Sequence, residues 1–406
     1  MPLLVAGSLG LAAGSAAGFL LAAELARPVI GVFGVERYAE FLTGHDYALY
    51  LGVWPIGVAV ALVGVALGPW GRMLGGLGAL LVLAGAILVG VALDRSRLFA
   101  VGWTSYAPGA RPPSFHEVRL ELDVGLALGL AGIICAAAPL AGRGGPLRAA
   151  GLASACIVPF PLATVLADAA GSTWEPSRHV AWYGAVLPFL GAIGESVGRL
   201  RLARLYALSL AAFVPVAAAV WIEHAVRAPL GDGGWEDAAL ALPLVGALAA
   251  ILVTLAFARP SLPVAFAACA LVALAVSGLA GAYAAASDPF DHVTDTQVVD
   301  VHLHLALAGF VLFALLGLAH ARLPALDDRL GALELALLFA GTATLTIAEW
   351  LAGHGGMPRR VDDYAPRFAG ENLAAAVGGG LAAAAILVFL FDAARASRFP
   401  NPRLRS

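Results

Sequence analysis

The chain has no lysine among its 406 residues, and charged side chains make up only 13% of it. An average soluble domain is about a quarter charged, so this composition excludes an ordinary soluble enzyme of one to three domains. The net charge of −3 provides no basic surface for a nucleic acid. What the sequence has in excess is apolar residues, at 61%, which indicates a polytopic membrane protein.

Cysteine is also scarce. Cys135, Cys156 and Cys269 each lie inside an apolar run, without CxxC or any paired spacing. The sequence therefore favours neither a disulfide framework nor a thiolate metal site. The first cation is Arg27, so the apolar start of the chain has no basic n-region and is predicted to be a retained helix rather than a cleaved signal peptide.

The apolar residues gather into runs that are each long enough to cross a bilayer, which takes about 20 residues per helix. Strands are excluded because the runs are too long and lack period-two alternation. We predict an all-α, polytopic bundle of twelve transmembrane helices forming a single membrane domain over 1–406, with no soluble domain. The predicted spans are 3–23, 44–68, 73–93, 122–141, 149–170, 179–198, 203–226, 238–258, 262–286, 292–320, 330–353 and 371–394.

Twelve spans place both termini on one side of the membrane. The short connections on that side are rich in arginine, as in 199–204, whereas the longer loops opposite carry most of the acids, as in 232–237. The positive-inside rule then predicts cytoplasmic N- and C-termini in a cell (inner) membrane.

Ionisable groups inside membrane spans are costly, so each is a candidate for function. Several such candidates fall at one depth in the predicted outer half: His45, His224, His302, His304 and the pair Arg359–Arg360. Glu223 lies beside His224, near the outer end of the span 203–226. A structural alternative is that such residues sit at helix ends wetted by headgroups, and we prefer it for His292, His320 and His354. His302 and His304 lie in the middle of a span, which favours a buried site.

The spacing of His302 and His304 carries further information. A helix turns about 100° per residue, so residues two apart point to opposite faces. One helix can then offer an imidazole to each of two cofactors, whereas a single metal ion would prefer an i,i+4 pair. The spacing is therefore better suited to two haems than to one zinc ion.

Two stretches carry a family resemblance. Residues 295–304 read D-T-Q-V-V-D-V-H-L-H, similar to the H-D-T-Y-x-V-V-x-H-F-H-Y stretch of the haem-copper oxidase superfamily, as in cytochrome c oxidase subunit I. Residues 356–364 read G-M-P-R-R-V-D-D-Y, which resembles the family's G-M-P-R-R-x-x-D-Y loop. The twelve-span count is also that of the family, and the clear matches cover 288–394.

The resemblance implies a role for each matching residue. His302 would be the proximal ligand of a high-spin haem, and His304 an axial ligand of a low-spin haem. His45, in Thr-Gly-His, would be the second ligand of the low-spin haem. Arg359 and Arg360 would hold the haem propionates, which suits the bidentate geometry of guanidinium groups. The chain lacks CxxCH, so no covalent haem c is expected.

The sequence departs from the family where the copper ion would bind. Residues 220–226 read V-W-I-E-H-A-V and resemble the V-W-x-H-H stretch, with Glu223 in place of the first histidine and His224 retained. The G-H-P-E-V-Y segment of helix six is missing. Three alternatives stay open: a non-haem metal such as iron bound by His224 and Glu223, since carboxylates shift a site from copper towards iron; no metal; or a misaligned but ordinary copper site.

Three hypotheses for the function of the chain also stay open. The first is an oxidoreductase of the terminal oxidase or nitric oxide reductase type, which reduces O2 or NO with His302, His224 and Glu223 at the catalytic centre. The second is a non-catalytic di-haem subunit for electron transfer or gas sensing, and the third is a haem-free transporter. The expected electron donor is quinol or a partner subunit carrying cytochrome c or copper. The absence of lysine removes one proton route of the family, which argues against proton pumping.

Overall fold

The computed structural model describes residues 69–96, 113–138, 145–160, 162–163, 166, 178–227, 235–286, 296–358 and 365–398. Regular structure in these residues is helical, apart from an isolated bridge between Thr296 and Pro358. The predicted spans 3–23 and 44–68 lie outside the described residues. The chain forms two compact units, one made of 54–264 with 317–322, and the other of 1–53, 265–316 and 323–406.

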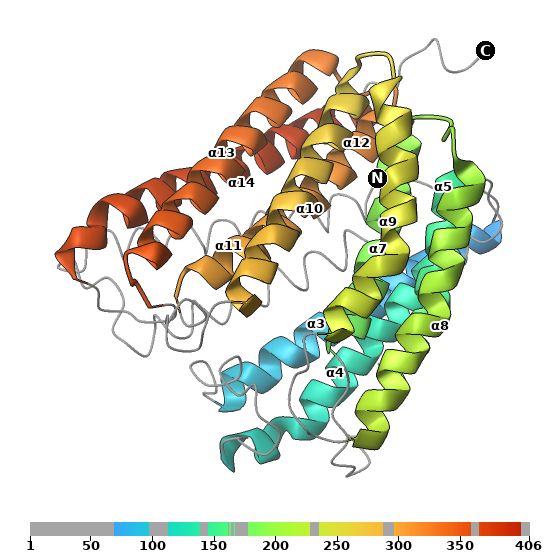
Figure 1. Ribbon diagram of the computed structural model, residues 1–406, viewed down its shortest axis with the longest axis vertical. Helices are drawn as coiled ribbons and strands as arrows, with labels where there is room; N and C mark the ends of the chain where they lie inside the picture. The colour runs from blue at the N-terminus through green and yellow to red at the C-terminus, as the bar shows by residue number, and fades with distance from the viewer. Residues whose placement is uncertain are drawn as a thin grey trace. The chain divides into compact units, whose positions relative to one another are not determined.

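The 54–264 unit is built from paired apolar helices. Its helices are α3 (Pro69–Ser96), α4 (Pro113–Ala137), α5 (Gly145–Ile157), α7 (Arg178–Ser196), α8 (Ala203–Arg227) and α9 (Trp235–Ala256). α3 packs along α4, α5 along α7 and α8, and α8 along α9 (Figure 1). Close approach depends on small residues: a Cβ atom added at Gly132 of α4 would lie 2.6 Å from the carbonyl oxygen of Gly78 on α3. Packing through small residues is common between membrane helices, because it lets the backbones come close.

Two helices of this unit differ from the predicted spans. α5 ends at Ile157 within the predicted span 149–170, but beyond a turn at Val158 the described residues 159–160, 162–163 and 166 are again helical. The backbone N–H of Leu162 donates to the carbonyl of Val158 at 3.1 Å, and the turn comes directly before Pro159, whose missing backbone N–H interrupts the hydrogen bonds of a regular helix. α4 begins at Pro113, nine residues before the predicted start. Proline is favoured at the first position of a helix, where its missing N–H would have no partner.

The C-terminal unit holds the segment with the histidine pair. α10 (Leu262–Ala286) joins it from Ala265 onward, and α11 (Val298–His304), the π-helix η4 (Leu305–Val311) and α12 (Leu312–Arg322) form one continuous span. The end of α12, from Gly317, groups with the other unit. α13 (Asp328–His354), the short η5 (Pro366–Phe368) and α14 (Ala369–Arg398) complete the unit.

α13 and α14 lie side by side as an antiparallel pair (Figure 1). Their backbones approach so closely at Gly341 that an added Cβ atom would lie 2.6 Å from the backbone nitrogen of Ala382. α11 reaches α13 in the same way, since a Cβ atom at Gly353 would lie 2.5 Å from the backbone nitrogen of Val298. The start of α11 is therefore fixed against the end of α13 by direct backbone packing.

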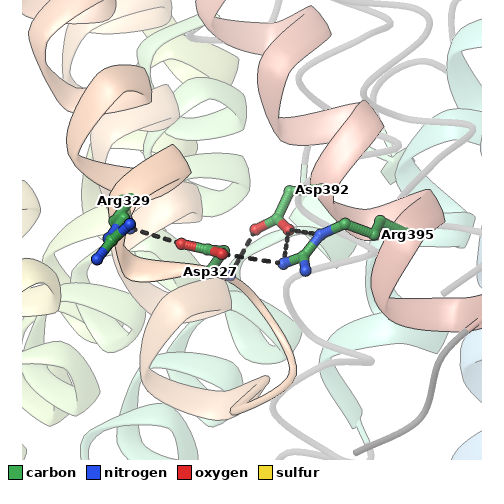
Figure 2. Close-up of polar contacts among 4 residues, drawn as sticks. All are labelled: Asp327, Arg329, Asp392 and Arg395. Atoms are coloured by element: carbon green, nitrogen blue, oxygen red, sulfur yellow. Dashed lines mark hydrogen bonds and ion pairs between the residues drawn. The ribbon is translucent and has the colours of Figure 1, made fainter.

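A polar cluster joins the other ends of α13 and α14 (Figure 2). The carboxylate of Asp392, which is fully buried, accepts the backbone N–H of Asp327 at 2.8 Å and the Arg395 guanidinium at 2.7 Å. Asp327 in turn caps α13 by accepting the backbone N–H of Arg329 at 2.8 Å. This hydrogen bond holds the pKa of the Asp327 carboxyl below its usual range. The cluster thus satisfies helix-end donors that would otherwise be unpaired.

Within the described residues, six helical segments are long and apolar enough to cross a membrane: Ala203–Glu223, Ala239–Ala256, Leu262–Ala284, Val298–Arg322, Asp328–His354 and Pro366–Ala396. They correspond to the last six predicted spans but for a few residues at the ends. In Val298–Arg322, 76% of the apolar window is buried, against 33% in each of the others. The span that carries the histidine pair is therefore the most enclosed of the six.

Candidate functional site

The two stretches that carry the family resemblance meet at one end of the C-terminal unit. Thr296 forms an isolated antiparallel bridge with Pro358, and the backbone N–H of Gln297 donates to the carbonyl of Met357 at 3.2 Å. Met357 is fully buried. The residues that immediately precede Arg359 are thereby fixed against the start of α11. Arg359 and Arg360 themselves lie outside the described residues.

The ring of His302 is held by α10. Its Nδ1 lies 2.8 Å from the carbonyl oxygen of Ser277 and 3.1 Å from the Ser277 hydroxyl, and that hydroxyl also donates to the carbonyl of His302 at 2.9 Å. A carbonyl oxygen only accepts, so the ring carries its proton on Nδ1 in this arrangement. The other nitrogen, Nε2, is then unprotonated, which is the form that binds a metal ion.

Space for this ring is provided by a glycine one turn further along α10. A Cβ atom added at Gly281 would lie 2.8 Å from Nδ1 and 3.0 Å from Cε1 of His302. Real Cβ contacts are essentially never shorter than 3.0 Å. Gly281 therefore forms a cradle that any larger residue would fill, and with Ser277 it sets the position of the imidazole.

The ring of His304 is held from a different helix. Its Nδ1 lies 2.7 Å from a carboxylate oxygen of Glu349 on α13. Both groups are enclosed, with 18% of the His304 side chain and 6% of the Glu349 side chain exposed. A carboxylate in contact with Nδ1 favours the tautomer with its proton on that atom, and so leaves Nε2 as the metal-binding nitrogen.

The two imidazoles thus contact helices on different flanks of α11, His302 on α10 and His304 on α13. This agrees with the divergence predicted from the rotation of 100° per residue. Directly after His304 the backbone widens into the π-helix Leu305–Val311. Such π-segments are rare and are frequently found at functional sites.

This donor set fits two haem irons. Each histidine has an oxygen atom close to its Nδ1, a hydrogen-bonding carbonyl for His302 and a carboxylate at ion-pair distance for His304, and such neighbours orient histidine ligands of metals. Two single imidazoles that face different ways cannot share one ion, but each could hold the iron of its own haem. Across the described residues there is also no cluster of three or more His, Cys, Asp or Glu side chains that could hold a metal ion by itself.

The other predicted site residues are only partly covered by the described residues. Glu223 lies half-buried near the end of α8, in the 54–264 unit. His224 follows it on the same helix, and its side chain is outside what the structure describes. His45 also lies outside the described residues. The haem ligation by His45 and the metal site of Glu223 and His224 stay predictions.

Three residues gain a role that the sequence did not assign. Ser277 and Gly281 stand in an Ala- and Leu-rich run and give no signal in the sequence, because their parts depend on a carbonyl group and on an empty volume. Glu349 does give a signal, since an acid near the end of an apolar span is a candidate for function by default. Its partner could not be read from the sequence.

Comparison with known proteins agrees with the resemblance. The family model described as cytochrome c and quinol oxidase polypeptide I matches residues 1–381. A probable cytochrome c oxidase subunit 1-beta of Nocardia farcinica is 25% identical over 455 residues, covering 94% of this chain and 75% of that protein.

Shorter matches are more similar. A probable cytochrome c oxidase subunit 1-alpha of Streptomyces avermitilis is 35% identical over 141 residues, which is 32% of this chain and 24% of that protein. A cytochrome c oxidase polypeptide 1 of Halobacterium salinarum is 33% identical over 138 residues, which is 32% of this chain and 23% of that protein. The matched part of the chain therefore spans about a quarter of the length of these two relatives, and three quarters of the Nocardia protein when 94% of the chain is matched.

Proposed function

The chain belongs to the cytochrome c and quinol oxidase polypeptide I family, and from this we propose that it is an integral-membrane haem protein of the terminal-oxidase type that holds two haems. In this proposal His302 binds the iron of a high-spin haem, and His304 with His45 binds the iron of a low-spin haem. Arg359 and Arg360 hold the haem propionates.

The observation that carries the proposal is the engagement of both Nδ1 atoms. His302 is held by the Ser277 carbonyl at 2.8 Å and His304 by the Glu349 carboxylate at 2.7 Å, from helices on different flanks of α11. A haem-free transporter would have no reason to orient two mid-span imidazoles in this way. Any buried imidazole needs an acceptor for its N–H, but here the acceptor oxygen lies at Nδ1 of both rings, which leaves both Nε2 atoms in the unprotonated form that binds a metal ion, so the arrangement favours metal ligation.

In this proposal, the haem ligands and the residues that hold them have different roles at the two haems. When bound, haem supplies the one-electron chemistry, and a five-coordinate iron has an open face for a gas. His304 and His45 would together hold the low-spin haem and leave no ligand position of its iron open, which suits electron transfer. Ser277 and Gly281 hold the His302 ring in one orientation. Arg359 and Arg360, which follow Met357 and Pro358 in the sequence, would neutralise propionate charge.

The gas that the protein would reduce depends on which metal Glu223 and His224 bind beside the high-spin haem. O2 is the substrate in the terminal-oxidase proposal. Glu223 in place of a histidine favours non-haem iron bound with His224, and a nitric oxide reductase activity would then be expected. The same substitution supports a second candidate function, a di-haem subunit that transfers electrons or senses a gas without reducing it. Glu223 is half-buried, as a ligand at the edge of an enclosed site would be.

The remaining parts of the proposal concern the membrane and the electron donor. We propose twelve spans with both termini in the cytoplasm, of which six fall in the described residues. The donor is quinol or a partner subunit that carries cytochrome c or copper.

A reduced-minus-oxidised spectrum of the purified protein, with and without CO, tests the proposal. Two haems are expected, one of which binds CO, and metal analysis separates a catalytic protein with an additional iron or copper from a di-haem carrier. We expect His304→Ala to abolish the low-spin spectrum and His302→Ala to abolish CO binding. The absence of a Soret band in the wild-type protein would refute both haem functions and leave the transporter.

A further inference from the structure

Glu349 is a buried carboxylate in the most costly place for one, inside an apolar helix of a membrane protein. It is 5% exposed, and one of its oxygens lies 2.7 Å from Nδ1 of His304. Among the described residues its second oxygen, Oε2, has no hydrogen-bonding partner. Burial of a carboxylate is strongly unfavourable unless it is well paired, so its main polar interaction is with His304.

The pair is not needed to dock α11 on α13. That contact is made one turn away at Gly353, where the two backbones come so close that even a Cβ atom would clash with Val298. α13 and α14 are likewise held by close packing at Gly341. A role in packing therefore does not explain why an acid stands at this position.

The chemistry of the contact between Glu349 and His304 explains why an acid stands at this position. A carboxylate oxygen at ion-pair distance from Nδ1 makes the imidazole more basic at Nε2 through its negative charge and favours one orientation of the ring. A more basic axial ligand stabilises ferric over ferrous haem, and the hydrogen bonding of an axial ligand is one of the means by which a protein sets the reduction potential. The negative charge of Glu349 close to His304 also stabilises the ferric form, and so it lowers the reduction potential further.

We infer that Glu349 is a positioning residue that holds the His304 imidazole through Nδ1 and lowers the reduction potential of the haem that His304 binds. The inference rests on the proposed function, because it presupposes low-spin haem at His304. The corresponding acceptor for His302 is the neutral carbonyl of Ser277. The structure thus gives the two histidines acceptors of different charge, so that the low-spin haem carries the more basic ligand.

The test is a spectroelectrochemical titration of the purified full chain, with Glu349→Gln compared with the wild type. The variant keeps an oxygen acceptor of similar size but loses the charge. We expect the midpoint potential of the low-spin haem to rise, so that at a fixed ambient potential the ferrous-to-ferric ratio increases about tenfold, which is about 59 mV for a one-electron couple. The largest EPR g value of the ferric haem should move toward that of neutral imidazole ligation.

Glu334→Gln is the matched control. Glu334 is a fully buried acid on the same helix, α13. It lies fifteen residues before Glu349, which is about 22 Å along the helix axis. This variant should leave the g value unchanged and shift the midpoint much less. If Glu349→Gln and the control behave alike, the inference is overturned.

Loss of haem is also informative. If Glu349→Gln loses the low-spin spectrum while Glu349→Asp retains it, the carboxylate is required to hold His304, which supports the inference. If Glu349→Asp loses it while Glu349→Gln retains it at the wild-type midpoint potential, the site depends on side-chain length rather than charge, which refutes the inference. A wild-type protein without any low-spin haem would instead refute the proposed function.

Discussion

Replacing Gly281 by alanine should disable His302 as a ligand while leaving the fold intact. The added Cβ atom would lie 2.8 Å from Nδ1 of His302, and ordinary van der Waals contact begins at 3.4 Å, so the ring must move by about 0.6 Å. The ring cannot move toward α10, and moving away lengthens its 2.8 Å hydrogen bond to the Ser277 carbonyl. Loss of that bond costs about 1 kcal/mol, and overpacking of this kind typically costs about 1–3 kcal/mol in total.

The assay is the CO difference spectrum of the high-spin haem, with thermal unfolding in detergent measured on the same samples. Gly278→Ala is the control, because a Cβ atom at this position of the same helix has nothing within 4 Å. We expect Gly281→Ala to lose CO binding or shift its band, to keep the low-spin spectrum, and to unfold at a slightly lower temperature. If Gly281→Ala binds CO as the wild type and Gly278→Ala do, the cradle does not position a ligand.

Three further predictions concern other parts of the chain. Asp392→Ala should lower the free energy of unfolding by about 1.5–3 kcal/mol, measured by denaturation, because the backbone N–H of Asp327 and the partly exposed Arg395 lose their buried acceptor (Figure 2). Asp327→Asn should have a lower free energy of unfolding than the wild type at neutral pH. Because the pKa of the Asp327 carboxyl is lowered in the folded protein, its stabilising contribution is fully present above the ordinary pKa of about 3.8 and is lost as the pH falls through the folded pKa. The stability profiles of the two proteins should therefore converge below pH 3.8. Glu223→Ala should remove any non-haem metal from the purified protein, and an unchanged metal content would contradict the iron ligation.

The sequence predicted the apolar spans better than their ends. Composition and run length located the six membrane-crossing helices of the described residues, because a bilayer sets the length of an apolar helix. The differences at the helix ends have local causes, as at α4, which begins at Pro113, nine residues before the predicted start. The π-helix Leu305–Val311 could not be predicted either, since its residues form an ordinary apolar pattern.

For the candidate site, the sequence predicted directions but not partners. The spacing of His302 and His304 defines two opposite faces on one helix, and the contacts with α10 and α13 agree with that divergence. The atoms that contact each ring depend on how the neighbouring helices pack. Packing places the main-chain carbonyl of Ser277 beside His302 and the side-chain carboxylate of Glu349 beside His304. The carbonyl of Ser277 would be present with any residue at that position, whereas the charge beside His304 exists only because residue 349 is glutamate. A substitution at 349 can therefore change the electronic character of one ligand without altering the fold, and this makes Glu349 the residue through which the two histidines can be distinguished experimentally.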